Sequence, residues 1–173
     1  HLLTAKDVSY RINESHAKIL FATAEEDVIE HVGLALPKCT GLQEVLYTQK
    51  VAGFKVIEEE MEKQSETLDV HRPNPNGSML CYFTSGTTGM PKMVEHNYYY
   101  PIGHIITANY WHKVVDDGLH FTMAETGWAK CSWGKIYGQW ICGTAIFAYD
   151  YNGRFTPTDV LPFIGKYKIT TFC

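Results

Sequence analysis

Short apolar segments of strand type alternate with segments of helical periodicity along the chain, and this alternation constrains the possible folds more than any other feature. We expect strands at 18–22, 45–47, 79–83, 93–94, 119–123, 144–149 and 169–172. We expect helices from about 5, over 25–36 and 54–61, from about 99, over 128–142 and after 156. Such alternation is typical of parallel strands covered by helices. The sequence therefore predicts an α/β fold of layered, largely parallel sheets flanked by helices.

Two of the expected helices have clear capping signals at their first residues. Thr4 is followed three residues later by Asp7, and Thr156 is followed by Pro157 and then by Asp159. A hydroxyl at the N-cap and an acid in the first turn satisfy free backbone N–H groups, and proline fits the first helical position. We therefore expect helices to begin directly after Thr4 and Thr156.

The segment 67–77 is the best candidate for a connection, because it contains two prolines, two asparagines and a glycine. We expect it to join an α/β subregion at 1–66 to a second subregion at 78–173. The chain ends at Cys173, inside an expected strand, whereas domain boundaries usually fall in polar linkers. We therefore expect a fragment of a larger domain.

Composition excludes several classes of function. The net charge is −4 and the basic residues are scattered, so we expect no nucleic-acid partner. No apolar segment approaches the roughly 20 residues of a membrane-spanning helix. The five cysteines are odd in number and form no C-x-x-C pair, which argues against disulfides and a zinc site. We interpret them as reduced thiols and expect a cytoplasmic protein.

The segment from Thr84 to Lys92 is the strongest candidate for chemistry. It contains four hydroxyl side chains, two glycines and a terminal lysine, and it directly follows an expected strand. Glycines let backbone N–H groups approach an anion, hydroxyls donate to phosphate oxygens, and lysine supplies a positive charge. Only two residues separate Gly86 from Gly89, so this is not the P-loop of kinases and GTPases. On composition alone, a flexible surface loop remains the alternative.

The order of residues from Phe83 to Lys92 closely resembles the signature loop of the adenylate-forming superfamily, which includes acyl-CoA synthetases, luciferases and peptide-synthetase adenylation domains. The resemblance implies that this chain is an internal part of the large N-terminal domain. It also implies that the loop binds the outer phosphates of ATP. The implied phosphate-binding residues are Thr84, Ser85, Gly86, Thr87, Thr88, Gly89 and Lys92. The main catalytic lysine, the adenine and magnesium segment and the small C-terminal domain are expected beyond Cys173, so we expect no metal ligands in this chain.

Residues after the loop look like the medium-chain or acetate-like branch of acyl-CoA synthetases. The resemblance places His96 just past the loop, and Trp128 in a Glu-Thr-Gly-Trp segment, similar to the family's Asp-x-Gly-Trp at the acyl pocket. Together with Trp133, they are candidates for the acyl pocket. The alternatives are a packed or surface histidine for His96 and ordinary core packing for the two tryptophans.

The reaction implied by the resemblance is ATP-dependent activation of a carboxylic acid to acyl-AMP, followed by thioester formation with coenzyme A. ATP, Mg²⁺ and coenzyme A would serve the whole enzyme, with a small carboxylic acid as substrate and a place in fatty acid metabolism. The isolated chain is expected to be inactive. An adenylation domain that loads a carrier protein and a non-catalytic nucleotide-binding fragment remain alternatives.

Overall fold

The computed structural model describes residues 3–68, 72–85, 89–150 and 156–173. The chain divides into two compact units, each built from two stretches of sequence. The first unit comprises His1–Arg72 and Phe83–Val94, and the second comprises Pro73–Tyr82 and Glu95–Cys173. Each unit is described by itself. The predicted boundaries of 1–66, 67–77 and 78–173 stay a prediction.

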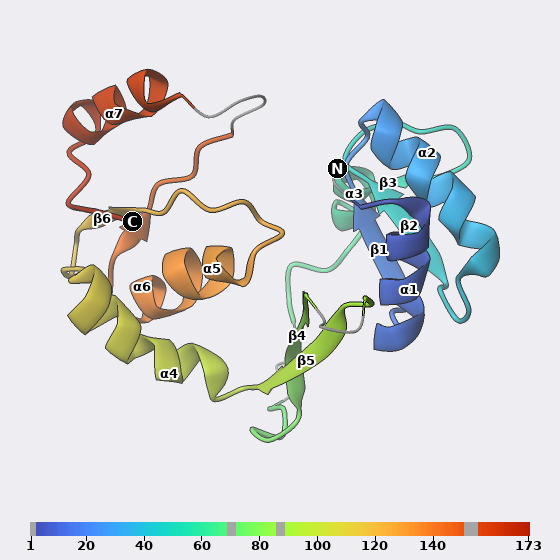
Figure 1. Cartoon of the computed structure of the whole chain (residues 1–173), viewed down its shortest axis with the longest axis horizontal. Helices are drawn as coiled ribbons and strands as arrows, with labels where there is room; N and C mark the ends of the chain where they lie inside the picture. The colour runs from blue at the N-terminus through green and yellow to red at the C-terminus, as the bar shows by residue number, and fades with distance from the viewer. Residues whose placement is uncertain (1–2, 69–71, 86–88, 151–155) are drawn as a thin grey trace. The chain divides into compact units, whose positions relative to one another are not determined.

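The first unit is a small parallel sheet covered by helices (Figure 1). Its three strands are β1 (Ile19–Ala22), β2 (Glu44–Tyr47) and β3 (Lys55–Val56), in the order β1-β2-β3. Its helices are α1 (Ala5–Ser15), α2 (Glu26–Ala35), the short 3-10 helix η1 (Leu36–Lys38) and α3 (Ile57–Met61). Val32, Val45 and Tyr47 form the buried centre of the core, and Phe54 packs against it.

Helix α1 begins where the capping signal predicts. The backbone N–H of Asp7 donates to the Thr4 hydroxyl at 3.4 Å, and the N–H of Thr4 donates to the Asp7 carboxylate at 3.1 Å, which completes a capping box. The apolar face of this helix buries Ile12, which is 5% exposed. The helix is therefore held firmly at its first turn.

Strands β4 (Ser78–Thr84) and β5 (Lys92–Asn97) pair with each other, and each passes from one unit into the other. Both expected strands are confirmed, and the structure extends them beyond the expected residues 79–83 and 93–94. The expected phosphate loop lies between their neighbouring ends.

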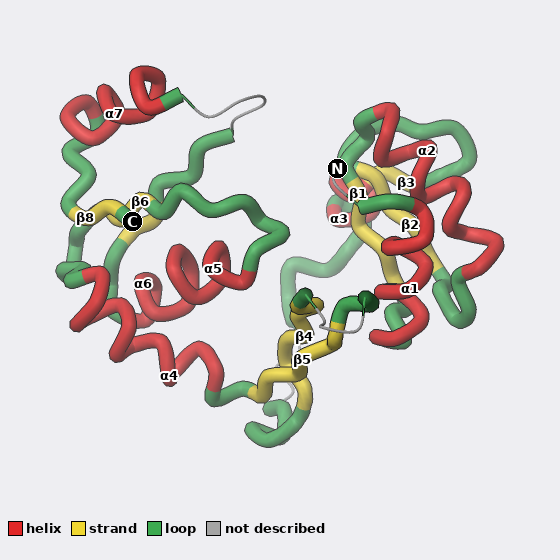
Figure 2. The backbone as a smooth tube through the Cα atoms, viewed as in Figure 1, coloured by secondary structure: helices red, strands yellow, loops and turns green. Residues whose placement is uncertain are grey.

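The second unit is built on a parallel sheet of order β7-β6-β8. Figure 2 labels two of its strands, β6 and β8. The strands are β6 (Leu119–Phe121), β7 (Ala145–Ile146) and β8 (Thr171–Phe172). The helices are α4 (Tyr100–Ile106), the π-helix η2 (Thr107–His112), α5 (Ala129–Cys131), the π-helix η3 (Ser132–Ile136), α6 (Tyr137–Ile141) and α7 (Pro157–Lys166). Phe121, Val160 and Ile169 form the buried core. The predicted α/β class with parallel sheets and flanking helices is confirmed.

The helix expected over 128–142 is regular only at its two ends, because η3 separates α5 from α6. The carbonyl oxygen of Gly134, inside η3, accepts hydrogen bonds from the side chains of Thr122 at 2.5 Å and Gln139 at 3.0 Å. A carbonyl that is occupied by side chains is compatible with a locally wider turn. The strand expected over 144–149 is likewise reduced to Ala145–Ile146. No helix in the described ranges is long and apolar enough to cross a membrane.

Candidate phosphate loop and acyl-pocket residues

The candidate phosphate loop joins the end of β4 to the start of β5. Thr84 is the last residue of β4 and Lys92 is the first residue of β5. The Thr84 hydroxyl donates to the backbone carbonyl of Lys92 at 3.4 Å, which closes the base of the loop. Gly89 has a φ of +97°, a backbone conformation that favours glycine. The predicted residues Gly86, Thr87 and Thr88 lie outside the described residues.

The described polar groups of this loop are accessible to a ligand. Thr84, Ser85, Gly89 and Lys92 are all exposed. Hydroxyls and an ammonium group that follow a strand end can bind an anion such as a phosphate. The structure therefore brings Thr84, Ser85, Gly89 and Lys92 to one loop, while their role in binding ATP stays a prediction.

Both flanks of this loop contact helix α1. The hydroxyl of Tyr10 donates to the backbone carbonyl of Pro91 at 2.8 Å. The Tyr10 ring also meets the Phe83 ring edge to face, with 6.1 Å between the centroids. The guanidinium of Arg11 lies 5.4 Å from the centroid of the same Phe83 ring. Sequence reasoning assigned no role to Tyr10 or Arg11, because Tyr10 and Pro91 are 81 residues apart in the chain.

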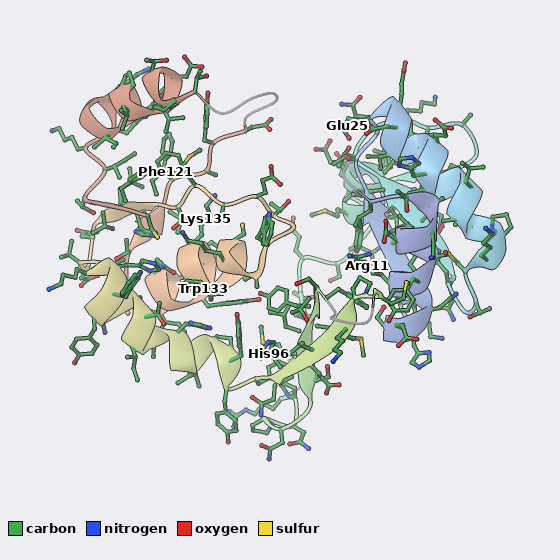
Figure 3. All side chains as sticks on the ribbon, in the orientation of Figure 1. Arg11, Glu25, His96, Phe121, Trp133 and Lys135 are labelled. Atoms are coloured by element: carbon green, nitrogen blue, oxygen red, sulfur yellow. The ribbon has the colours of Figure 1, made fainter. Side chains whose placement is uncertain are left out.

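Two of the three acyl-pocket candidates belong to one series of ring contacts in the second unit (Figure 3). His96 is half-buried on β5, and its ring centroid lies 4.3 Å from that of Tyr100. The ring centroid of Tyr100 in turn lies 4.5 Å from that of His104. The ring of Trp133 stacks between His104 at 5.7 Å and His112 at 6.0 Å. The structure thus connects His96 to Trp133 through side chains that the sequence did not single out as ligands.

Trp128, the third candidate, has a different environment. It is the N-cap residue of α5 and its side chain is 68% exposed. Of the ring contacts found in the described part of the chain, none involves Trp128. Among the described residues, Trp128 therefore makes no ring contact with the His96–Trp133 series.

A hollow of about 500 Å³ lies beside this series. Its lining is mostly apolar and includes the indole of Trp133. The residues that line it are His104, Ile106, Thr107, Tyr110, Trp111 and Trp133. Hollows of this size and character accommodate small organic ligands.

Buried histidines anchor η3 behind Trp133. The ring Nε2 of His120 lies 2.9 Å from the Gly134 carbonyl oxygen and 2.7 Å from the Thr122 hydroxyl, and because a carbonyl only accepts, we assign the ring proton to Nε2. The Nδ1 atom of His120 then accepts from the Thr171 hydroxyl at 2.8 Å. The amide nitrogen of Gln139 donates both to Gly134 and, at 2.9 Å, to Nδ1 of His112. These contacts hold the helical turn that bears Trp133.

Burial keeps these histidines neutral. It lowers the pKa of His112 to about 4, with smaller contributions from His120 and Lys130. Burial also lowers the pKa of His104 and of His120. The rings on either side of Trp133 are therefore uncharged at neutral pH, which suits an apolar ligand. Sequence reasoning missed His112, His120 and Gln139, because no local pattern marks a contact made through folding.

A metal site was not expected in this chain. Within the described ranges, no group of three or more His, Cys, Asp or Glu side chains is arranged to hold a metal ion.

The chain belongs to the AMP-binding enzyme family, whose model matches residues 1–173. It is 31% identical over 175 residues to acyl-coenzyme A synthetase ACSM3, mitochondrial, of Pongo abelii, and 32% identical over 174 residues to acyl-coenzyme A synthetase ACSM4, mitochondrial, of Homo sapiens. These alignments cover 99% of this chain but only 29% and 30% of the two relatives. The expected membership of the adenylate-forming superfamily is confirmed.

Solved structures show the same fold at low sequence identity. An anthranilate CoA ligase in complex with anthranoyl-AMP matches with a TM-score of 0.83 at 18% identity, over 99% of this chain and 32% of that chain. A luciferase-like enzyme from the nonluminescent Zophobas morio mealworm matches with a TM-score of 0.75 at 18% identity, over 98% of this chain and 38% of that chain. The arrangement of strands and helices is therefore that of adenylate-forming enzymes.

The expected cytoplasmic location is wrong, because the curated relatives are described as mitochondrial. The expectation rested on the five cysteines, all of which are free thiols. Reduced thiols indicate a reducing environment, but they do not distinguish the cytoplasm from other reducing compartments.

Proposed function

We propose that the protein containing this chain activates a carboxylic acid with MgATP and transfers the acyl group to the thiol of coenzyme A. The observation that carries the proposal is the loop from Thr84 to Lys92, with its signature sequence and the exposed side chains of Thr84, Ser85 and Lys92. The names of the curated relatives, acyl-coenzyme A synthetases, support the same reaction. The chain spans about 30% of their length, so the activity belongs to the whole protein.

In the first step, a carboxylate oxygen attacks the α-phosphorus of ATP. The phosphoanhydride bond between the α-phosphorus and the oxygen that bridges to the β-phosphate breaks. Acyl-AMP forms, and pyrophosphate leaves with the negative charge. The proposed role of the loop is to hold the β- and γ-phosphates and to stabilise that charge as it develops. Lys92 contributes the positive charge and Ser85 contributes a hydroxyl donor, whereas the Thr84 hydroxyl would have to give up its 3.4 Å bond to the Lys92 carbonyl in order to donate to a phosphate oxygen. Magnesium enters as part of the MgATP substrate.

We propose that the acid lies against the second unit, with its hydrocarbon chain near Trp133. The hollow of about 500 Å³ and the neutral histidine rings around Trp133 support an apolar substituent, such as that of a fatty acid. His96 stands at the other end of the ring series and is proposed to border the same pocket. Trp128 stays a weaker candidate, because its indole is largely exposed.

The decisive substitution is Lys92→Ala in the whole enzyme, assayed by ATP-dependent release of pyrophosphate. Loss of one charged hydrogen-bonding partner of phosphate is expected to lower kcat/KM for MgATP by about 10- to 100-fold. Lys50→Ala is a matched control, because Lys50 is an exposed lysine of the same unit. Unchanged pyrophosphate release in Lys92→Ala would reject the proposed role of the loop.

The acceptor of the acyl group requires a separate measurement. We expect the whole enzyme to form a thioester with free coenzyme A. Formation of a thioester only on a carrier-protein thiol would instead identify an adenylation domain that loads a carrier. If the enzyme forms the adenylate but no thioester on either acceptor, the proposed activation of the acid stands and the proposed transfer to coenzyme A is rejected.

We also propose a mitochondrial location, on the basis of the curated relatives. Fractionation of cells that express the whole protein should recover it with mitochondrial markers. Recovery with cytoplasmic markers alone would overturn this proposal without affecting the proposed reaction.

A further inference from the structure

Helix α1 contacts the residues on both sides of the phosphate loop, within a single unit of the structure. Phe83 precedes the loop and Pro91 lies near its end, and Tyr10 reaches both of them. Its ring packs against Phe83 with 6.1 Å between centroids, and its hydroxyl donates to the Pro91 carbonyl at 2.8 Å. One side chain therefore joins the entrance and the exit of the loop.

Arg11 provides a second contact to the same entrance. Its guanidinium lies 5.4 Å from the centroid of the Phe83 ring and 3.4 Å from a carboxylate oxygen of Asp7. Asp7 is in turn bonded to Thr4 in the capping box of α1, with 2.6 Å between the Thr4 hydroxyl and the carboxylate. Arg11 is thus held in place from the first turn of the helix while it packs on Phe83.

Such contacts matter because the loop between them must be ordered when a ligand binds. Glycine has more accessible backbone conformations than other residues, so fixing Gly89 when a ligand binds costs conformational entropy and opposes binding. Contacts that fix the loop at both flanks reduce that opposing entropy before the ligand arrives. The interaction of Tyr10 with a backbone carbonyl places the exit of the loop without occupying any of its phosphate-binding groups.

We propose that Tyr10 is a positioning residue for the phosphate loop, with Arg11 in support, and that α1 thereby sets the affinity of the enzyme for the outer phosphates of its nucleotide. This inference rests on the proposed function of the loop. It adds a determinant of phosphate affinity from a helix that lies about 80 residues earlier in the chain.

The test is Tyr10→Phe in the whole enzyme, because phenylalanine keeps the ring against Phe83 and removes only the hydroxyl bonded to Pro91. Loss of this bond is expected to raise KM for MgATP and the inhibition constant of pyrophosphate by about fivefold. The KM for the acid and the value of kcat should stay within about twofold of the parent. Tyr99→Phe is the matched control, because Tyr99 is 54% exposed and should change none of these constants.

A second comparison separates positioning from general destabilisation. If Tyr10 acts through the loop, its effect on KM for MgATP should shrink when Tyr10→Phe is combined with Lys92→Ala, because residues that act on one site are not additive. Equal effects in both backgrounds, or an equal rise in KM for the acid, would overturn the inference. So would an unchanged KM for MgATP in Tyr10→Phe. An impaired Lys92→Ala enzyme beside a normal Tyr10→Phe enzyme would reject the inference alone, whereas a normal Lys92→Ala enzyme would reject the proposed function itself.

Discussion

Gly138 permits the close packing of α6 against α4, and its replacement by alanine should reveal how tightly the turn bearing Trp133 is held. A Cβ atom at Gly138 would lie 2.9 Å from the Cβ atom of Ala108, and it would meet the backbone carbonyl of His104 at a closer approach than any real Cβ contact. His104 is also the residue whose ring stacks on Trp133. The substitution therefore forces two helices apart at the candidate acyl pocket.

The expected cost follows from which atoms must move. Overpacking in a close-packed region costs about 1–3 kcal/mol, and here the obstacle includes backbone, so we expect a value near 3 kcal/mol. Alanine gains about 1 kcal/mol over glycine in a helix, which leaves a net loss of about 2 kcal/mol for Gly138→Ala. Gly103→Ala is the matched control, because Gly103 lies in α4 and a Cβ atom there meets nothing within 4 Å. That control should be stabilised by about 0.5–1 kcal/mol.

Urea-induced unfolding of the whole protein, followed by tryptophan fluorescence, measures both free energies of unfolding. The two alanine variants should shift the midpoint in opposite directions. The Gly138→Ala enzyme should also show a higher KM for the acid at unchanged KM for MgATP, because the stack of His104 on Trp133 is disturbed. Equal stability of the Gly138→Ala and Gly103→Ala proteins would refute the packing argument.

Three further outcomes follow from the described contacts. Trp133→Ala should raise KM for the acid at least several-fold and leave KM for MgATP unchanged, as steady-state kinetics would show. Thr4→Ala removes the cap of α1 and should lower the free energy of unfolding by about 1 kcal/mol in urea titrations. Burial lowers the pKa of His112 in the folded protein to about 4, so the unfolded chain binds a proton at His112 at a higher pH than the folded protein does. The contribution of His112 to stability should therefore be full above about pH 6.5 and decline as the pH falls from about 6.5 to 4. A His112→Asn variant should show a shallower decline in the same titration.

Local signals in the sequence were sufficient for the starts of α1 and α7 and for the strand before the phosphate loop. The helix expected over 54–61 was partly wrong, because Lys55–Val56 pair with β2 as strand β3 and α3 begins only at Ile57. The cap at Thr4 and the proline after Thr156 act within a single turn, so the structure begins α1 and α7 where they predict. The apolar strand before the phosphate loop was also confirmed as β4. These features depend on neighbours along the chain, which a sequence displays directly.

Features decided by contacts between distant segments could not be predicted in the same way. The helix expected over 128–142 contains a π-helical turn. The carbonyl of Gly134 within this turn contacts His120, which lies on β6, and Thr122, which lies just after β6. The strand over 144–149 pairs only at Ala145 and Ile146, opposite Leu119 and His120 of the short strand β6. In both cases the partner, rather than the local pattern, determines where regular structure ends.

The candidate site also combines a local sequence signal with contacts between distant segments. The signature loop alone is therefore not enough to predict the affinity for a nucleotide. The residue types from Thr84 to Lys92 identify a phosphate ligand, but they do not say how far the backbone is ordered before that ligand arrives. Tyr10 contacts both flanks of the loop, through its hydrogen bond to Pro91 and its ring contact with Phe83, and no spacing in the sequence reveals these contacts. If Tyr10 positions the loop as proposed, two members of the family with identical loops are expected to differ in phosphate affinity when the helix that contacts the loop differs. Comparing such proteins by the loop alone would miss the residue that sets the difference.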